Sequence, residues 1–379
     1  MTRNVVTFRN GRLFDGSSLR DGHAIRFADG HATESGPDGD IAKDGDVVDL
    51  AGDIFSPGYV DLQVNGGDGV MFNDDPSPET LRRIAKAHRR LGVSALLPTL
   101  ITDTADKTHA AIAAATEAVR QGVPGIAGLH LEGPHLSVAR KGAHDPALIR
   151  PMQQDDLDAL LAARQALPVL KVTVAPENVT QEQVATLARA GVLISLGHSD
   201  SDFETCRRYF AAGARCVTHL FNAMSQLGNR EPGLVGAALA SGEVSAGLIA
   251  DGVHVHPETI RTAWFAKKGP GRIFLVSDAM AVAGTGCTTF KLNGRPICRR
   301  NGILTLPDGT LAGADLDLTT AIKVMVEKVG ISTERALQAA TSVPAALIGR
   351  SCIGLDVRHK KLSEMIRISG DLSGIVALT

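Results

Sequence analysis

Aromatic side chains, long apolar runs and paired cysteines are all scarce in this sequence of 379 residues. Eleven Phe, two Tyr and one Trp are too few for an aromatic platform that binds carbohydrate chains. No run approaches the ~18 consecutive apolar residues of a membrane-spanning helix. The five cysteines include no C-x-x-C pair, which argues against a disulfide framework and a thiolate zinc site. The N-terminus lacks the apolar core of a secretory signal, so we expect a cytoplasmic protein.

Charge of either sign is not in excess, because 39 basic residues face 41 acidic ones and the net charge is −2. A nucleic-acid partner would need a basic face, and a membrane anchor would need a polybasic segment, so neither partner is expected. With 44% hydrophobic residues, the chain is too apolar to be disordered. Forty glycines fit an α/β chain with many turns.

The opening segment, residues 1–54, differs in pattern from the rest of the chain. It consists of short runs that stop at Asn-Gly or Asp-Gly, which are hairpin signals. No long helical pattern interrupts these runs before Pro57. The segment therefore predicts the first part of a small β domain.

After Pro57, short apolar runs alternate with amphipathic segments of helical period. This alternation is typical of repeated βαβ units and of a parallel sheet. Eight such steps predict a closed (β/α)8 barrel over residues 55–348, and a doubly wound open sheet is the alternative. The expected strands are Tyr59–Val64, Val93–Leu100, Ile126–Leu131, Leu170–Ala175, Val192–Leu196, Arg215–Leu220, Ser245–Ala250 and Arg272–Val276.

Polar and ionisable side chains follow most of these expected strands. Because barrel enzymes carry their active sites at the carboxyl ends of the strands, we expect these side chains to converge. The strand ends carry Gln63, Asn65, Glu132, Glu177, His198, His219, Asp251 and Asp278.

His198 and His219 follow neighbouring strands, so both imidazoles can point to one place. With Glu132 they match the two-histidine, one-carboxylate shell of a catalytic zinc, which leaves a position for water. Each residue alone is more typical of a hydrogen-bonded group at the edge of the core, but the three together favour a metal. Asp278 ends the last strand and would either serve as a general base or cap the helix that follows.

Several longer segments are highly specific in combination. They include Pro57-Gly-Tyr-Val-Asp-Leu-Gln-Val-Asn-Gly, His130-Leu-Glu-Gly-Pro-His, Lys141-Gly-Ala-His-Asp-Pro, Thr218-His-Leu-Phe-Asn-Ala-Met and Val276-Ser-Asp-Ala-Met. The chain thereby resembles the amidohydrolase superfamily and, within it, the N-acetylglucosamine-6-phosphate deacetylases. The resemblance implies metal-dependent hydrolysis of N-acetylglucosamine-6-phosphate to glucosamine-6-phosphate and acetate, in amino-sugar catabolism and cell-wall sugar recycling.

The resemblance also implies roles for individual residues. Glu132, His198 and His219 would hold the metal, Asp278 would be the general base and then the acid, and His144 would polarise the acetyl carbonyl. The residues expected to contact the substrate are Asn222, Ala223, Arg230, His254, Gln63 and Asn65. Arg230 would bind the phosphate of the partner subunit's substrate, because a guanidinium suits phosphate oxygens and the family shares this residue between subunits. A homodimer follows from that sharing alone.

The pair Gln63 and Asn65 stands where many amidohydrolases carry the two histidines of a second metal site. Amide oxygens are poor replacements for imidazole on a transition metal. We therefore expect one divalent ion per subunit, with zinc as the default and iron, cobalt or manganese also compatible with the ligands.

The tail of the chain departs from the family's closing segment, of which Ile353-Gly survives. Residues 349–379 are expected to complete the small β domain as a sandwich, with an atypical pairing. Three rival functions stay open at this point. They are deacetylation of N-acetylgalactosamine-6-phosphate or hydrolysis of another amide, a metal-dependent sugar-phosphate isomerisation, and ligand binding without catalysis on the same barrel.

Overall fold

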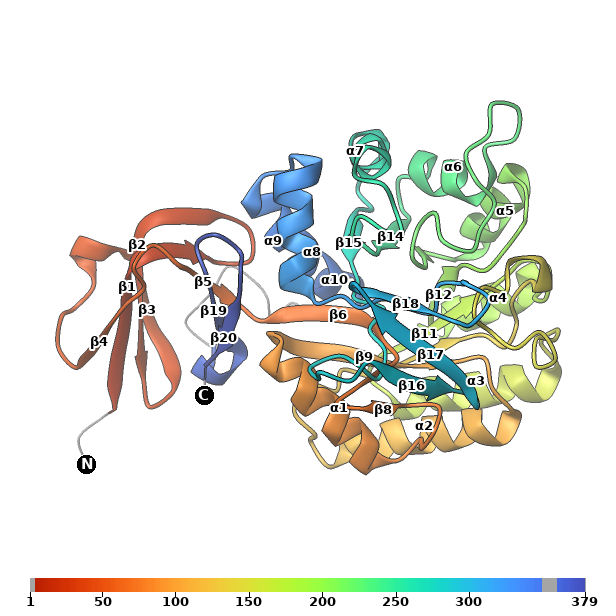
Figure 1. The fold of residues 1–379 in the computed structure, drawn as a ribbon, viewed down its shortest axis with the longest axis horizontal. Helices are drawn as coiled ribbons and strands as arrows, with labels where there is room; N and C mark the ends of the chain where they lie inside the picture. Colours follow the sequence, from red (N-terminus) through yellow and green to blue (C-terminus); the bar gives the residue numbers. More distant parts are fainter. Residues whose placement is uncertain (1–3, 350–359, 379) are drawn as a thin grey trace.

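The computed structural model describes residues 4–349 and 360–378 and contains an eight-stranded parallel barrel beside a smaller β unit (Figure 1). The barrel strands pair in chain order, and a bridge between Val64 and Ala279 joins the first strand to the end of the last. The expected closed barrel is thus confirmed, and the doubly wound sheet is wrong. The strands are β6 (Tyr59–Val64), β9 (Val93–Ile101), β10 (Leu129–Glu132), β11 (Leu170–Val174), β12 (Leu193–Leu196), β13 (Cys216–Val217), β14 (Ser245–Leu248) and β15 (Ile273–Leu275).

Helices surround the barrel and bury their apolar faces against the strands (Figure 1). Many start where a side chain accepts a hydrogen bond from a free backbone N–H of the first turn, as Ser77 and Asp202 do. The helices are α1 (Pro78–Arg90), α2 (Ala105–Arg120), α3 (Gln154–Ala166), α4 (Gln181–Arg189), α5 (Phe203–Ala212), α6 (Gly233–Ala240), α7 (Pro257–Ala266), α8 (Leu318–Val324), α9 (Thr333–Ala340) and α10 (Ser342–Leu347). Among the described residues, no helix is both long and apolar enough to cross a membrane.

The smaller unit is one seven-stranded sheet built from both ends of the chain. Its C-terminal strand Met365–Ile368 pairs antiparallel with Ile54–Pro57, so the two segments meet in one sheet despite the atypical tail. Phe8, Phe27 and Phe55 form the centre of its own small core. Ile353-Gly lies outside the described residues. The strands are β1 (Val5–Phe14), β2 (Leu19–Ala28), β3 (His31–Pro37), β4 (Asp46–Asp49), β5 (Ile54–Pro57), β19 (Met365–Ile368) and β20 (Ile375–Ala377).

A three-stranded antiparallel sheet follows the last barrel strand and was not expected from the sequence. Its two turns are Asn293-Gly294 and Asn301-Gly302, and all four residues have positive φ, as two-residue hairpin turns require. Leu292 and the loop that follows the sheet reach the carboxyl end of the barrel. The strands are β16 (Thr289–Leu292), β17 (Arg295–Arg300) and β18 (Ile303–Thr305), and β7 (Gly66–Gly67) pairs separately with β8 (Val70–Met71).

Candidate metal centre and active site

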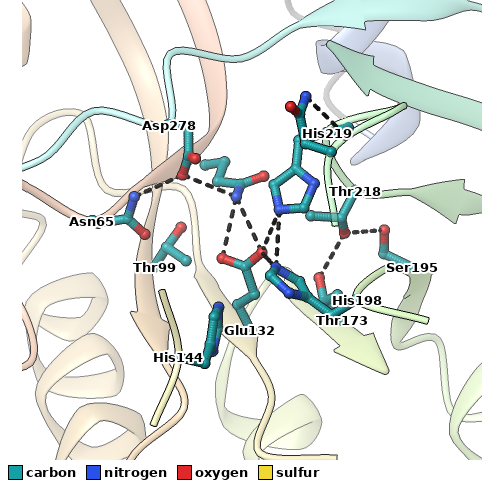
Figure 2. Close-up of polar contacts among 12 residues, drawn as sticks. Asn65, Thr99, Glu132, His144, Thr173, Ser195, His198, Thr218, His219 and Asp278 are labelled. Carbon is teal, nitrogen blue, oxygen red and sulfur yellow. Dashed lines mark hydrogen bonds and ion pairs between the residues drawn. The ribbon is translucent and has the colours of Figure 1, made fainter. Parts of the chain in front are cut away.

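Three buried side chains meet at the carboxyl end of the barrel (Figure 2). Glu132 is the last residue of β10, while His198 and His219 lie two residues beyond β12 and β13. Oε1 of Glu132 is 3.2 Å from Nε2 of His198 and 3.0 Å from Nε2 of His219. The two Nε2 atoms are 3.1 Å apart. The structure therefore brings together the three ligand candidates that come from separate strands.

This donor set fits a divalent ion. Nδ1 of His198 lies 2.8 Å from the carbonyl oxygen of Arg140, which can only accept, so Nδ1 carries the proton and Nε2 keeps its lone pair. Two imidazole nitrogens and a carboxylate oxygen this close repel one another unless a cation lies between them. Zinc–nitrogen bonds of ~2.0–2.1 Å place tetrahedral ligands about 3.3 Å apart, close to the separations in the structure.

The electrostatics of the cluster point the same way. Burial on its own would raise the pKa of Glu132, but the adjacent imidazoles of His198 and His219 hold that pKa well below its usual range. Burial would lower the pKa of His219, and the Glu132 carboxylate raises it instead. The Glu132 carboxylate is therefore ionised, and the cluster attracts positive charge at this point.

The turns that carry these side chains have unusual backbone geometry. His198, His219, Asp278 and Ala223 all have positive φ, at 49°, 27°, 49° and 49°. Such angles cost non-glycine residues ~1–3 kcal/mol each and cluster at functional sites, where the surrounding fold compensates. The strain lets each chain segment turn sharply after its strand and direct the side chain over the barrel axis.

Asp278 lies beside the cluster and is held by the first barrel strand. Its Oδ1 accepts a hydrogen bond of 2.7 Å from Asn65 Nδ2 and one of 3.0 Å from Gln63 Nε2. Gln63 Nε2 also faces both oxygens of Glu132, at 3.3 and 3.2 Å. Burial and the nearby Glu132 charge raise the pKa of Asp278. A carboxyl group with a raised pKa, close to a metal position, is suited to move protons.

His144 approaches the cluster from the loop after β10, and its ring centroid is 4.4 Å from that of His198. The backbone N–H of Thr102 donates to Nδ1 of His144 at 3.3 Å, and the Thr102 hydroxyl lies 2.7 Å from the same nitrogen. Because an N–H can only donate, Nδ1 is the acceptor and Nε2 carries the proton. Burial and the neighbouring His198 lower the pKa of His144 to about 3. His144 is thus a neutral hydrogen-bond donor.

A cavity of about 400 Å³ opens above the cluster. Its polar lining contains the ligand candidates, Asn65, His144 and Asp278, and its apolar lining comes partly from the loop after the three-stranded sheet. Leu292, Thr310 and Leu311 were not among the sequence candidates, although the two Asn-Gly turns between Leu292 and Thr310 were a usable hairpin signal. The lining residues of greatest interest are Asn65, Arg140, His144, Asn222, Ala223, His254, Leu292, Thr310 and Leu311.

The remaining candidates occupy three kinds of position. Asn222, Ala223 and His254 line the cavity, as expected for substrate contacts. Gln63 lies below it and bridges the two carboxylates. Arg230 is exposed and does not line the cavity of its own chain within the described residues.

A hydroxyl network supports the cluster from inside the barrel (Figure 2). Oγ1 of Thr173 is 2.7 Å from Oγ1 of Thr218, which is 2.6 Å from Oγ of Ser195. Nε2 of His130 lies 2.8 Å from Oγ1 of Thr173. Thr218 and His130 are close in sequence to two ligand candidates, so the network helps to fix their strands. In the sequence, only the alternation of side chains along a strand, which places every second one inside the barrel, could have indicated this network.

Comparison with known proteins agrees with the fold and this geometry. The model of the amidohydrolase family matches residues 54–355, so the chain belongs to the amidohydrolase family. The chain is 44% identical over 83% of its length to the N-acetylgalactosamine-6-phosphate deacetylase of Shewanella sp. (strain ANA-3), of which 79% is covered. It is 36% identical over 80% of its length to the N-acetylglucosamine-6-phosphate deacetylase of Haemophilus influenzae, again with 79% of that protein covered.

A solved structure extends the match to nearly the whole chain. The crystal structure of N-acetylglucosamine-6-phosphate deacetylase from Pasteurella multocida superposes with a TM-score of 0.91 at 30% identity, covering 98% of this chain and 97% of that one. The resemblance expected from the sequence is therefore confirmed, as is the hydrolase class. The roles of the individual site residues stay predictions.

Proposed function

We propose that the chain is a metal-dependent deacetylase that hydrolyses the acetamide of N-acetylglucosamine-6-phosphate to glucosamine-6-phosphate and acetate. The observation that carries this proposal is the convergence of Glu132, His198 and His219 beside Asp278, at the floor of a cavity large enough for a sugar phosphate. Relatives named as amino-sugar-phosphate deacetylases over most of the chain support it. The proposed pathway context is amino-sugar catabolism and cell-wall sugar recycling.

Glu132, His198 and His219 would hold one divalent ion, with zinc as the default because two imidazoles and a carboxylate suit it. When bound, such an ion supplies a Lewis acid that polarises a carbonyl and makes water more acidic. The side chains at the first barrel strand favour one ion rather than two. Gln63 and Asn65 direct amide N–H groups at Asp278, in a place where a second ion would need imidazole ligands.

The chain's own residues would carry the proton transfers. Asp278 takes a proton from the attacking water as general base and later gives it to the leaving amine as general acid. His144 donates from Nε2 to the oxygen of the acetyl group as negative charge develops on it. A positioned donor of this kind stabilises the oxyanion, commonly by ~3–4 kcal/mol. Asn65 and Gln63 keep the Asp278 carboxylate in place throughout.

The substrate's phosphate would lie toward Asn222, Ala223 and His254, which line one part of the cavity. We propose that a homodimer completes this end, with Arg230 reaching the partner's site. The exposure of Arg230 and its absence from the described lining of its own cavity support this placement. Free Cys206, Cys216, Cys287 and Cys298 support a reducing compartment, and we propose the cytoplasm.

Subunit mixing tests the dimer directly. Arg230→Ala and Asp278→Asn proteins should each be weakly active alone. A mixed dimer should regain activity, because the Arg230→Ala subunit keeps its base and receives Arg230 from its partner. If mixing restores nothing while mixed dimers are present, the arginine does not act across the interface.

N-acetylgalactosamine-6-phosphate is a second candidate substrate, favoured by the 44% identity to a deacetylase of that name. The two sugars differ in the configuration of one hydroxyl group. Acetate and amino-sugar product should be measured for both phosphates with metal-replete protein. A higher kcat/KM for the glucosamine form supports the proposal, and a higher value for the galactosamine form supports the second candidate. An isomeric product without acetate would indicate a sugar-phosphate isomerase.

A further inference from the structure

Asp251 and His254 form a buried pair at the wall of the cavity, in the loop after β14. Nδ1 of His254 is 2.6 Å from Oδ2 of Asp251, and both side chains are at most 10% exposed. His254 lines the cavity. The proposed chemistry above uses neither the carboxylate nor the pairing, although the sequence places Asp251 at a strand end.

The second oxygen of the carboxylate holds the loop itself. Oδ1 of Asp251 accepts the backbone N–H groups of Val253 and His254, each at 2.8 Å. Burial would raise the pKa of Asp251, but the hydrogen bonds from His254 and the backbone lower it. The carboxylate is therefore ionised and accepts three hydrogen bonds within four residues.

An ionised carboxylate can only accept, so Nδ1 of His254 must carry a proton. Nε2 is then the nitrogen left to face the cavity. With the phosphate bound, the imidazole would stand between two anions, with the Asp251 carboxylate at Nδ1 and the phosphate at Nε2, so both nitrogens would donate. A donor that carries positive charge binds an anionic oxygen about twice as strongly as a neutral donor does.

We propose that Asp251 is a positioning residue that orients His254, so that Nε2–H binds the phosphate of the substrate. This inference rests on the proposed function for the identity of the substrate. Asp251 would act only through His254 and would not contact the reacting amide. The loop after β14 would then bind the phosphate through His254, while the Asp251 carboxylate would not itself contact the phosphate.

Asp251→Asn separates the two tasks of the carboxylate. Asn keeps an Oδ1 that can accept the backbone N–H groups of Val253 and His254. It replaces Oδ2 by an amide donor, so Nδ1 of His254 becomes an acceptor and no longer faces an anion. We expect KM for the phosphorylated sugar to rise about tenfold, with kcat nearly unchanged. The unphosphorylated sugar should show no matching loss in kcat/KM.

A double-mutant cycle with His254→Gln distinguishes positioning from a general structural role. If Asp251 acts through His254, the double variant should bind no more weakly than His254→Gln alone. Additive losses would overturn the proposal, as would a wild-type KM in Asp251→Asn. Equal losses on both sugars would show that His254 contacts the sugar rather than the phosphate, and would also overturn it.

Asp15→Asn is the matched control, because Oδ1 of Asp15 accepts the N–H groups of Ser17 and Ser18, both at 2.8 Å, in a turn of the small β unit. It should leave both kinetic constants unchanged. Calorimetry with glucosamine-6-phosphate repeats the test without turnover, and Asp251→Asn should again bind about tenfold more weakly. If the wild type released no acetate while this binding difference held, the proposed function would fail and the role of Asp251 would stand.

Discussion

Asn65 donates a hydrogen bond of 2.7 Å to Oδ1 of Asp278 and thereby joins the first strand of the barrel to the end of the last. The same region closes the barrel, because the backbone N–H of Asp278 donates to the carbonyl oxygen of Gln63 at 3.1 Å. Closure of the fold and placement of the proposed base are therefore one structural feature. The amide groups of Asn65 and Gln63 are uncharged, so they leave the negative charge of the Asp278 carboxylate in place and it can still accept a proton.

Replacing Asp278 by Asn should separate proton transfer from metal binding. The Asn oxygen can still accept from Asn65, so the local structure should persist, but the base is lost. We expect kcat to fall by ~10²–10⁴-fold, with the metal content unchanged. Steady-state acetate release and elemental analysis measure the two quantities. Nearly full activity in this variant would remove Asp278 from the role of base.

His219→Ala should lose the metal and the activity together, because one of the three proposed protein ligands disappears. Residual activity should track residual metal across a titration with zinc. His109→Ala is the control, since His109 is exposed on α2 and far from the cluster in sequence. If the His219 variant kept a full equivalent of metal, His219 would not be a ligand.

The number of metal ions follows from the side chains of the first strand. Gln63 Nε2 already lies between Oδ1 of Asp278 and the oxygens of Glu132, at 3.0 to 3.3 Å. Active protein should therefore contain one divalent ion per chain. Two equivalents, retained after dialysis and required for activity, would contradict this.

His144 should follow a graded series of substitutions. Gln can place an amide N–H near the position of Nε2, whereas Ala cannot. We expect kcat to decrease from wild type to His144→Gln to His144→Ala, with a total loss of ~10²–10³-fold and little change in metal content. Equal activity of the three proteins would exclude a role for His144 in stabilising the oxyanion.

Asp61 gives a pH-dependent contribution to stability. It is fully buried, and burial raises its pKa to about 7 against opposing hydrogen bonds from Ser277 and Gln63. The folded state then holds a proton that the unfolded state releases, so stability falls as pH rises from about 4 to about 7 and is level above that. Asp61→Asn removes this term. Its melting temperature relative to wild type should rise over this range, and parallel pH profiles would contradict the assignment.

The barrel could be predicted from the sequence because apolar runs alternate with segments of helical period. The cluster could be predicted because its polar residues directly follow those apolar runs. The strand Tyr59–Val64 has the expected bounds, and β13 is shorter than expected, with only Cys216–Val217 hydrogen-bonded as a strand. The strained turn at His219, with a φ of 27°, explains this early end. A chain that must redirect its side chain over the barrel axis leaves the sheet sooner than its apolar pattern suggests.

Features that depend on partners distant in sequence were not predictable. The backbone N–H of Thr102 determines which ring nitrogen of His144 carries the proton. The carbonyl oxygen of Arg140 does the same for His198. Backbone groups are present at every residue, so no residue type signals them. The three-stranded sheet is different, since the Asn-Gly pairs at Asn293 and Asn301 were visible hairpin signals.

Acetate release from N-acetylglucosamine-6-phosphate should be measured beside release from N-acetylglucosamine, in metal-replete protein. It determines whether a mononuclear centre at Glu132, His198 and His219 hydrolyses the amide of a phosphorylated amino sugar. Acetate from the phosphorylated sugar, with little from the free sugar, is the predicted result. No acetate from either sugar, in protein that contains one equivalent of metal, would contradict it.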